Sequence, residues 1–71
     1  MAQVFKSIEL VGVSENSFDE AVRVAVRRAG ESIRSLQWLE VMDQRAYIKG
    51  GEVREFQVTA RIWFELEGEQ G

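Results

Sequence analysis

Residues 36–67 read LQWLEVMDQRAYIKGGEVREFQVTARIWFELE. Two stretches rich in apolar and β-branched residues flank a polar segment whose centre is Gly50 and Gly51. Glycine adopts positive φ angles without steric cost, and a two-residue hairpin turn needs such angles at both central positions. The segment therefore predicts two long antiparallel strands, 36–48 and 53–67, joined by a tight turn.

The turn also predicts the register of this hairpin. Lys49 lies opposite Glu52, so paired positions sum to 101. Side chains alternate between the faces of a strand, and one predicted face is apolar and suited to a helix: Leu39, Val41, Phe56, Val58, Ala60, Ile62, Phe64 and Leu66. The opposite face carries Trp38, Met42, Gln44, Gln57, Thr59, Arg61 and Trp63. Tryptophans in that position indicate a ligand or partner site, or else they simply cover the sheet or fill a subunit interface.

Upstream of the hairpin, the sequence predicts one strand and one helix. Residues 3–13, rich in Val, Ile and Phe, predict the strand. Ser17-Phe18-Asp19-Glu20 is typical of a capping box, in which the Ser17 hydroxyl accepts from the Glu20 amide and Glu20 reaches back to the Ser17 amide. Apolar residues then recur every three or four positions, which predicts an amphipathic helix running to about Arg34. The order strand, helix, strand, strand predicts an α+β fold with a three-stranded antiparallel sheet and the helix across one face.

Composition narrows the possible functions. The chain has 71 residues, no cysteine and no histidine, and a net charge of −3. A chain of this length forms at most one domain, 1–71, and it buries so little surface on folding that a monomer would be only marginally stable. Without disulfides or Cys and His metal sites, oligomerisation is the remaining source of stability. The absence of histidine also removes His-based nucleophile activation, and we expect no enzyme.

Charge and hydropathy narrow the expected partners as well. An acidic chain without a basic block disfavours nucleic acid, and the apolar runs are too short to span a membrane. The start of the chain lacks the pattern of a secretory signal, which predicts a cytoplasmic location. The acidic residues on the predicted strands are interpreted as solvated or paired surface groups rather than as a metal or catalytic site: Glu9, Glu40, Asp43, Glu55, Glu65 and Glu67.

Trp38 and Gln57 are the candidate binding residues. An indole is an electron-rich stacking platform, and a glutamine amide offers both a donor and an acceptor to the edge of a heterocycle. In the predicted register Gln57 lies opposite Gln44, six residues along the strand from Trp38, which is roughly 20 Å. If both side chains bind one small molecule, they come from different subunits unless the strands bend sharply.

Several segments, taken together and in order, resemble the dodecin family. They are VFKSIELVGVS (4–14), Ser17 before the helix, WLEV (38–41), EFQV (55–58) and FEL (64–66). The resemblance implies a β-α-β-β protomer whose sheet wraps partly around its helix, a hollow homododecamer, and storage of flavin rather than turnover. It implies FMN as the cofactor, with riboflavin or other flavins as alternatives, and coenzyme A as a possible second ligand.

The same resemblance assigns roles to three residues. Trp38 matches the tryptophan against which paired flavin rings stack at a two-fold axis, and Gln57 matches the glutamine that binds the pyrimidine edge. Arg45 matches an arginine near the flavin phosphate. Arg45 has the opposite strand parity to Trp38 in the predicted register, so either a bulge re-aims it, or it reaches the ligand from another subunit, or its role is structural.

Two other functions compete with flavin storage. One is a structural or protein-interaction oligomer that uses the exposed sheet face without a cofactor. The other is a flavin-dependent oxidoreductase, which needs an open ring face for its substrate. For Asp43, a surface carboxylate is preferred over a residue that holds a cation near the flavin.

Overall fold

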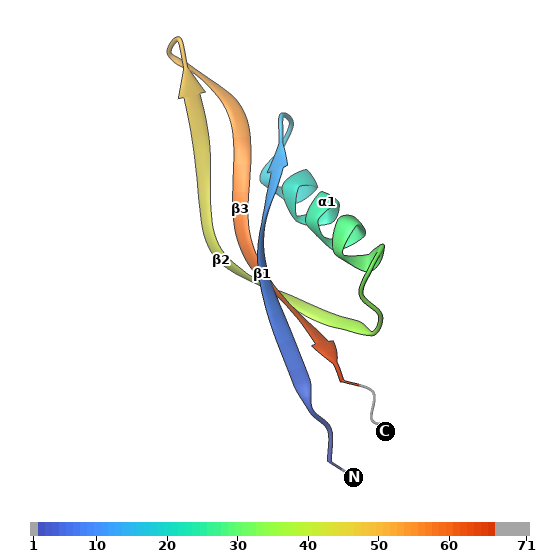
Figure 1. The fold of residues 1–71 in the computed structure, drawn as a ribbon. Helices are drawn as coiled ribbons and strands as arrows, with labels where there is room; N and C mark the ends of the chain where they lie inside the picture. Colours follow the sequence, from blue (N-terminus) through green and yellow to red (C-terminus); the bar gives the residue numbers. More distant parts are fainter. Residues whose placement is uncertain (1, 67–71) are drawn as a thin grey trace.

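A computed structural model describes residues 2–66 and contains four elements. They are β1 (Phe5–Ser14), α1 (Phe18–Gly30), β2 (Leu36–Lys49) and β3 (Glu52–Glu65). The strands form one antiparallel sheet in the order β1-β3-β2, so β1 pairs with β3, the second strand of the hairpin (Figure 1). The predicted β-α-β-β fold with one helix and a three-stranded antiparallel sheet is confirmed.

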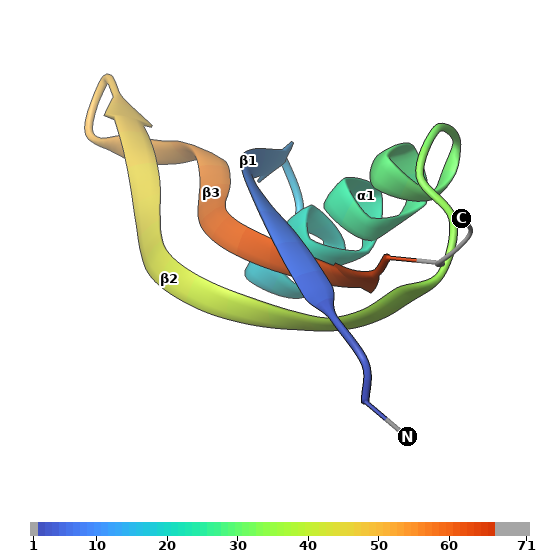
Figure 2. The same cartoon turned by 60° about the horizontal axis from the view of Figure 1, so that its bottom comes forward.

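The sheet is strongly curved. Figure 2 shows β2 and β3 bending towards the side of the sheet on which α1 lies, so the sheet partly surrounds the helix. The face that carries α1 is therefore concave and the opposite face, which we call the outer face, is convex. Because the outer face is convex, side chains near its two ends point away from one another.

The hairpin turn has the geometry that its glycines predict. Gly50 and Gly51 have φ angles of 63° and 79°, and Lys49 pairs with Glu52. Both are left-handed conformations in which a Cβ atom is strained. The strand boundaries differ from the prediction by one or two residues, and the predicted extension of the last strand to position 67 lies outside the described residues.

Only half of the predicted capping box forms at the start of α1. The Ser17 hydroxyl accepts a hydrogen bond from the Glu20 amide at 2.9 Å, as predicted. The Glu20 carboxylate does not reach back to the Ser17 amide, which donates to the Ser14 hydroxyl instead. Glu20 accepts from the Ser14 hydroxyl and from the Asn16 side chain, both at 2.6 Å. These two hydrogen bonds, that of Ser14 first, lower the pKa of Glu20, and they fix the end of β1 to the first turn of α1.

The prediction that the helix runs to about Arg34 was wrong. The helix ends at Gly30 with Glu31 as its C-cap, and the Ile33 amide donates back to the Ala29 carbonyl at 3.0 Å. The chain then reverses at Ser35, which has a φ angle of 62°, and the Ser35 carbonyl accepts from the Glu65 amide at 3.1 Å. The residues after Gly30 are therefore used to turn the chain into β2.

The core between α1 and the sheet is thin and built from small side chains. Among residues 2–66, its buried hydrophobic members are Ala21, Ala25, Ala29, Val58, Ala60 and Ile62. Gly12 lets β1 approach the helix, because a Cβ atom there would overlap the Ala21 carbonyl. Of the other predicted helix-facing residues, Leu39, Phe56 and Phe64 are half-buried, whereas Val41 and Leu66 are exposed. Val41 lies on the edge strand β2, beyond the part of the sheet that α1 covers.

Candidate functional site

A β-bulge at Met42 changes the predicted register. Trp38 pairs with Trp63 and Val41 with Ala60, as predicted, but Met42 has no partner and Asp43 pairs with Thr59. A second irregularity before the turn restores the predicted pairing near Lys49. Gln57 therefore lies opposite Arg45 and not opposite Gln44, which corrects the prediction.

The bulge places Arg45 on the outer face together with Trp38. An extra residue on one strand reverses the facing of the residues beyond it, here as far as the second irregularity after Tyr47. Arg45 therefore shares a face with Gln57, which lies six positions from Trp63 on β3. This is the first of the three alternatives for Arg45, re-aiming by a bulge. Gln44 lies opposite the buried Val58 and so belongs to the concave face, so its predicted place on the outer face was wrong.

One end of the outer face carries an aromatic cluster. The Trp38 and Trp63 rings are stacked, with centroids 6.0 Å apart and planes 24° from parallel. The Phe5 ring from β1 lies 5.0 Å from the Trp38 ring at a tilt of 50°. Trp38 still has 49% of its surface exposed. The protomer thus presents an indole that is held in place by its neighbours and remains open to a ligand.

Trp63 is fixed by a hydrogen bond as well as by stacking. Its indole Nε1–H donates to the Glu40 Oε1 atom at 3.3 Å. Trp63 and Glu40 were not predicted as site residues. The signal was present, because the predicted register already placed Trp38 opposite Trp63.

The other cluster on the outer face is polar. The Arg45 Nε–H donates to the Gln57 Oε1 atom at 2.8 Å, and the Gln57 Nε2 donates to the Glu55 Oε1 atom at 3.3 Å. A carboxylate oxygen of Asp43 lies 3.9 Å from Nη1 of Arg45. A primary amide has two N–H donors and two acceptor lone pairs, so Gln57 is oriented from both sides and keeps one donor and one acceptor for a ligand.

The two clusters do not meet within one protomer. Trp63, the neighbour of Trp38, and Gln57 are six residues apart on β3, which is about 20 Å along a strand. The outer face is convex, so the bend does not bring them together (Figure 2). The predicted separation of Trp38 and Gln57 is therefore present in the structure, and a single protomer carries these candidate binding residues in two separate clusters, which we call half-sites.

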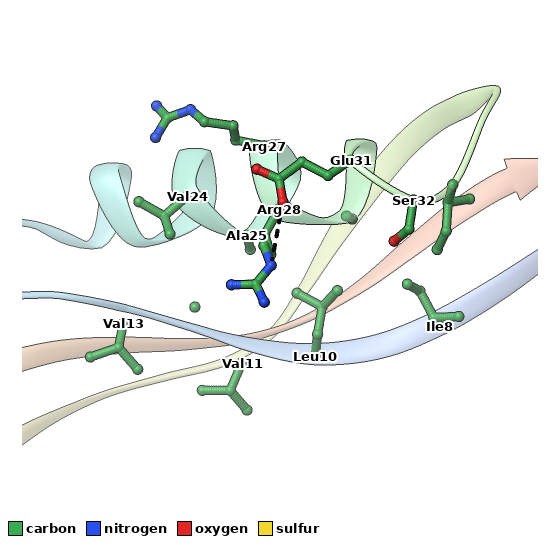
Figure 3. A pocket seen from close by; sticks show the side chains of 13 residues that line it. Ile8, Leu10, Val11, Val13, Val24, Ala25, Arg27, Arg28, Glu31 and Ser32 are labelled. Carbon is green, nitrogen blue, oxygen red and sulfur yellow. Dashed lines mark ion pairs between the residues drawn. The ribbon is translucent and has the colours of Figure 1, made fainter.

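Two hollows of the protomer border the helix, and one of them lies next to Trp38. A groove of about 550 Å³ runs between α1 and β1. Figure 3 shows Ile8 and Leu10 pointing into it from β1, with the Arg28–Glu31 ion pair at its edge, while Val11 points to the outer face. A smaller hollow of about 210 Å³ lies beside Trp38 and is lined by Val26, Leu36, Gln37, Leu39 and Ile62. The candidate site is thus an exposed face rather than a closed pocket.

Two further features bear on the kind of site. No cluster of three acidic, cysteine or histidine side chains suited to a metal ion occurs within residues 2–66. The same span contains no helix with the length and apolar character needed to cross a membrane.

Comparison with known proteins gives one consistent family. The model of the family described as Dodecin matches residues 4–67. A dodecin of Thermus thermophilus is 40% identical over 67 residues, which span 94% of this chain and 97% of the relative. A crystal structure of a Thermus thermophilus protein superposes with a TM-score of 0.91 at 38% identity, covering 96% of this chain and 100% of the other. The dodecin of Streptomyces coelicolor superposes with a TM-score of 0.90 at 39% identity, covering 94% and 96%.

Proposed function

This chain belongs to the dodecin family of small, non-enzymatic flavin-binding proteins, and from that premise we propose that it stores FMN in a hollow homododecamer. Flavin rings lie in pairs between Trp38 side chains where protomers meet, which shields them from photochemistry. Riboflavin is the alternative ligand. The observation that carries the proposal is the division of the binding residues into two exposed half-sites on one sheet face.

Trp38 has the chemistry that a flavin ring requires. The ring system of a flavin is flat and electron-poor, and it stacks well on an electron-rich indole. Trp38 is exposed, and Trp63 and Phe5 restrict its orientation. An indole that is already held loses little side-chain entropy when a ligand stacks on it.

Gln57 and Arg45 have complementary roles in the proposal. The remaining donor and acceptor of the Gln57 amide fit the pyrimidine edge of a flavin, which carries both kinds of group. Arg45 keeps N–H groups free of its hydrogen bond with Gln57, and these fit a phosphate, which favours FMN over riboflavin. The carboxylates of Asp43 and Glu55 beside them oppose a phosphate by their charge. Arg45 is therefore the residue on which the choice between the two flavins depends.

The proposed assembly accounts for the apolar surface of the protomer. Eleven large hydrophobic side chains are exposed among the described residues, and contiguous apolar surface of this kind marks an interaction site. The protomer is also elongated, with principal extents of 53 × 20 × 13 Å. Neighbouring copies would cover this surface and bring the Trp38 of one protomer towards the Gln57 and Arg45 of another. Light scattering is expected to give a mass about twelve times the 8.1 kDa of one chain.

The deciding experiment is an absorbance spectrum of the purified assembly, with the released pigment identified by mass. We expect a flavin spectrum, and strong quenching of FMN fluorescence when FMN is added to ligand-free protein. A colourless preparation that leaves added FMN and riboflavin unbound would instead support the second candidate, a structural or protein-interaction oligomer. Coenzyme A is added to the same titration as a possible second ligand. Cell fractionation tests the predicted cytoplasmic location.

A further inference from the structure

We infer that Trp63 is a second electron donor behind Trp38, and that Glu40 makes Trp63 the more stable place for the electron vacancy that light creates. The inference rests on the proposed function, because the flavin is the electron acceptor. It extends the electron transfer at the site to two residues beyond Trp38. Neither residue is needed to contact the ligand.

The geometry of the two indoles carries the inference. Their rings are stacked at 6.0 Å and 24°, within the range of offset aromatic stacking. Phe5, the other ring beside Trp38, is tilted by 50° and is much harder to oxidise than an indole. Trp63 is therefore the one neighbour of Trp38, among the described residues, whose ring is both stacked on it and able to give up an electron.

The electrons balance without any outside reactant. A photoexcited flavin takes one electron from Trp38, so the flavin is reduced by one electron and Trp38 becomes a radical cation. One electron then passes from Trp63 to Trp38, which restores Trp38 and moves the positive charge to Trp63. The electron on the flavin finally returns to Trp63. No bond forms or breaks, no proton leaves, and light is the only input.

Glu40 gives the pair a direction. Its Oε1 atom accepts the hydrogen bond from Trp63 at 3.3 Å, so a negative charge faces the ring of Trp63. Glu40 is also only two residues from Trp38 on β2, so its charge favours both indoles, and its preference for Trp63 is at most about fivefold, the effect of a unit charge at about 4 Å in surroundings as polar as water. The positive charge is therefore held on Trp63, which lies on the other side of Trp38 from a stacked ligand.

The stack itself is tested in the ligand-free protein. Two indoles in this arrangement couple their transitions, and we expect a paired positive and negative band in the near-ultraviolet circular dichroism. The bands should disappear in Trp63→Phe and equally in Trp38→Phe. Bands that survive in Trp63→Phe would overturn the inference, because they would show that Trp63 is not the partner of Trp38.

The electron step is tested by transient absorption of the FMN-loaded assembly. Wild type and Trp63→Phe are both loaded with FMN, and Trp63→Phe should lose at most about tenfold in affinity, the effect of one aromatic pair. We expect the indole radical signal to decay several-fold faster in Trp63→Phe than in wild type, and at an intermediate rate in Glu40→Gln, which keeps both indoles. Equal decay in all three proteins would overturn the inference.

Two other outcomes are informative. If Trp63→Phe no longer binds FMN, the decision rests on Glu40→Gln, which keeps both indoles: decay of the indole radical at the wild-type rate in Glu40→Gln would overturn the inference. If wild type itself does not bind FMN while the dichroism bands are present, the two indoles are stacked but the proposed function is wrong. The electron role is then wrong as well, because no electron acceptor is bound.

Discussion

Replacing Trp38 by alanine should abolish most of the flavin affinity. About half of the surface of this residue is open, and a buried aromatic side chain covers about 150–250 Å². A ring stacked on Trp38 therefore covers about 100 Å², which contributes about 2.5 kcal/mol at about 25 cal/mol per Å². Stacking adds about 0.5–1.5 kcal/mol. A loss of about 3–4 kcal/mol corresponds to a decrease in affinity of roughly 100- to 1,000-fold.

The assay is a titration of ligand-free assembly with FMN, followed by flavin fluorescence. Ile48→Ala is a matched control, because Ile48 is 64% exposed on the same strand but lies near the turn, away from both half-sites. Light scattering on each variant checks that the oligomer is intact. Trp38→Ala that remains assembled and binds FMN within about threefold of wild type would refute the stacking argument, since about threefold is far below the roughly 100-fold minimum loss expected.

Three more outcomes are expected. Asp43→Asn should raise FMN affinity by about threefold, since it removes a negative charge near a phosphate, and should leave riboflavin affinity unchanged; an equal gain for both flavins would contradict the assigned role of Arg45. Gly12→Ala should lower the stability of the fold by about 1–3 kcal/mol in thermal unfolding, because its Cβ atom overlaps the Ala21 carbonyl. Gly30→Ala, whose Cβ atom would make only an ordinary 3.8 Å contact with the Leu36 side chain, should raise it by up to about 1 kcal/mol. The hydrogen bonds that lower the pKa of Glu20 stabilise the fold at neutral pH, and this contribution is lost as the pH falls below the ordinary pKa of a glutamate. The thermal midpoint of wild type should therefore drop more in acid than that of Glu20→Gln. Parallel plots of thermal midpoint against pH for the two proteins would contradict this prediction.

Local chemistry explains why most of the fold could be predicted. The turn depends on two adjacent glycines, and the start of the helix depends on Ser17, so each is specified by a few neighbouring residues. The end of the helix was predicted wrongly because Ile33 continues the apolar stripe. What ends the helix is the reversal at Ser35 and its hydrogen bond to Glu65, which is distant in the sequence.

The sequence singles out the candidate binding residues one by one, but it did not predict their arrangement. Trp38, Gln57 and Arg45 stand out by residue type and by resemblance to a family, whereas their facing depends on the bulge at Met42. A bulge adds one residue to one strand without a characteristic residue type, because it is selected by the curvature and pairing of the whole sheet. The contact between Arg45 and Gln57 therefore became visible only in the structure.

The thin core and the binding face have a common cause. Small residues on α1, Ala21, Ala25 and Ala29, together with Gly12, let the helix lie close to the sheet. The largest side chains buried beneath the helix are Val58 and Ile62, and both tryptophans lie on the outer face instead. A larger core would stabilise the monomer but would need such rings inside. The protomer instead carries them on its outer face, where Trp38 is half exposed, so the surface that we expect neighbouring copies to cover is the same surface on which we propose that the ligand stacks.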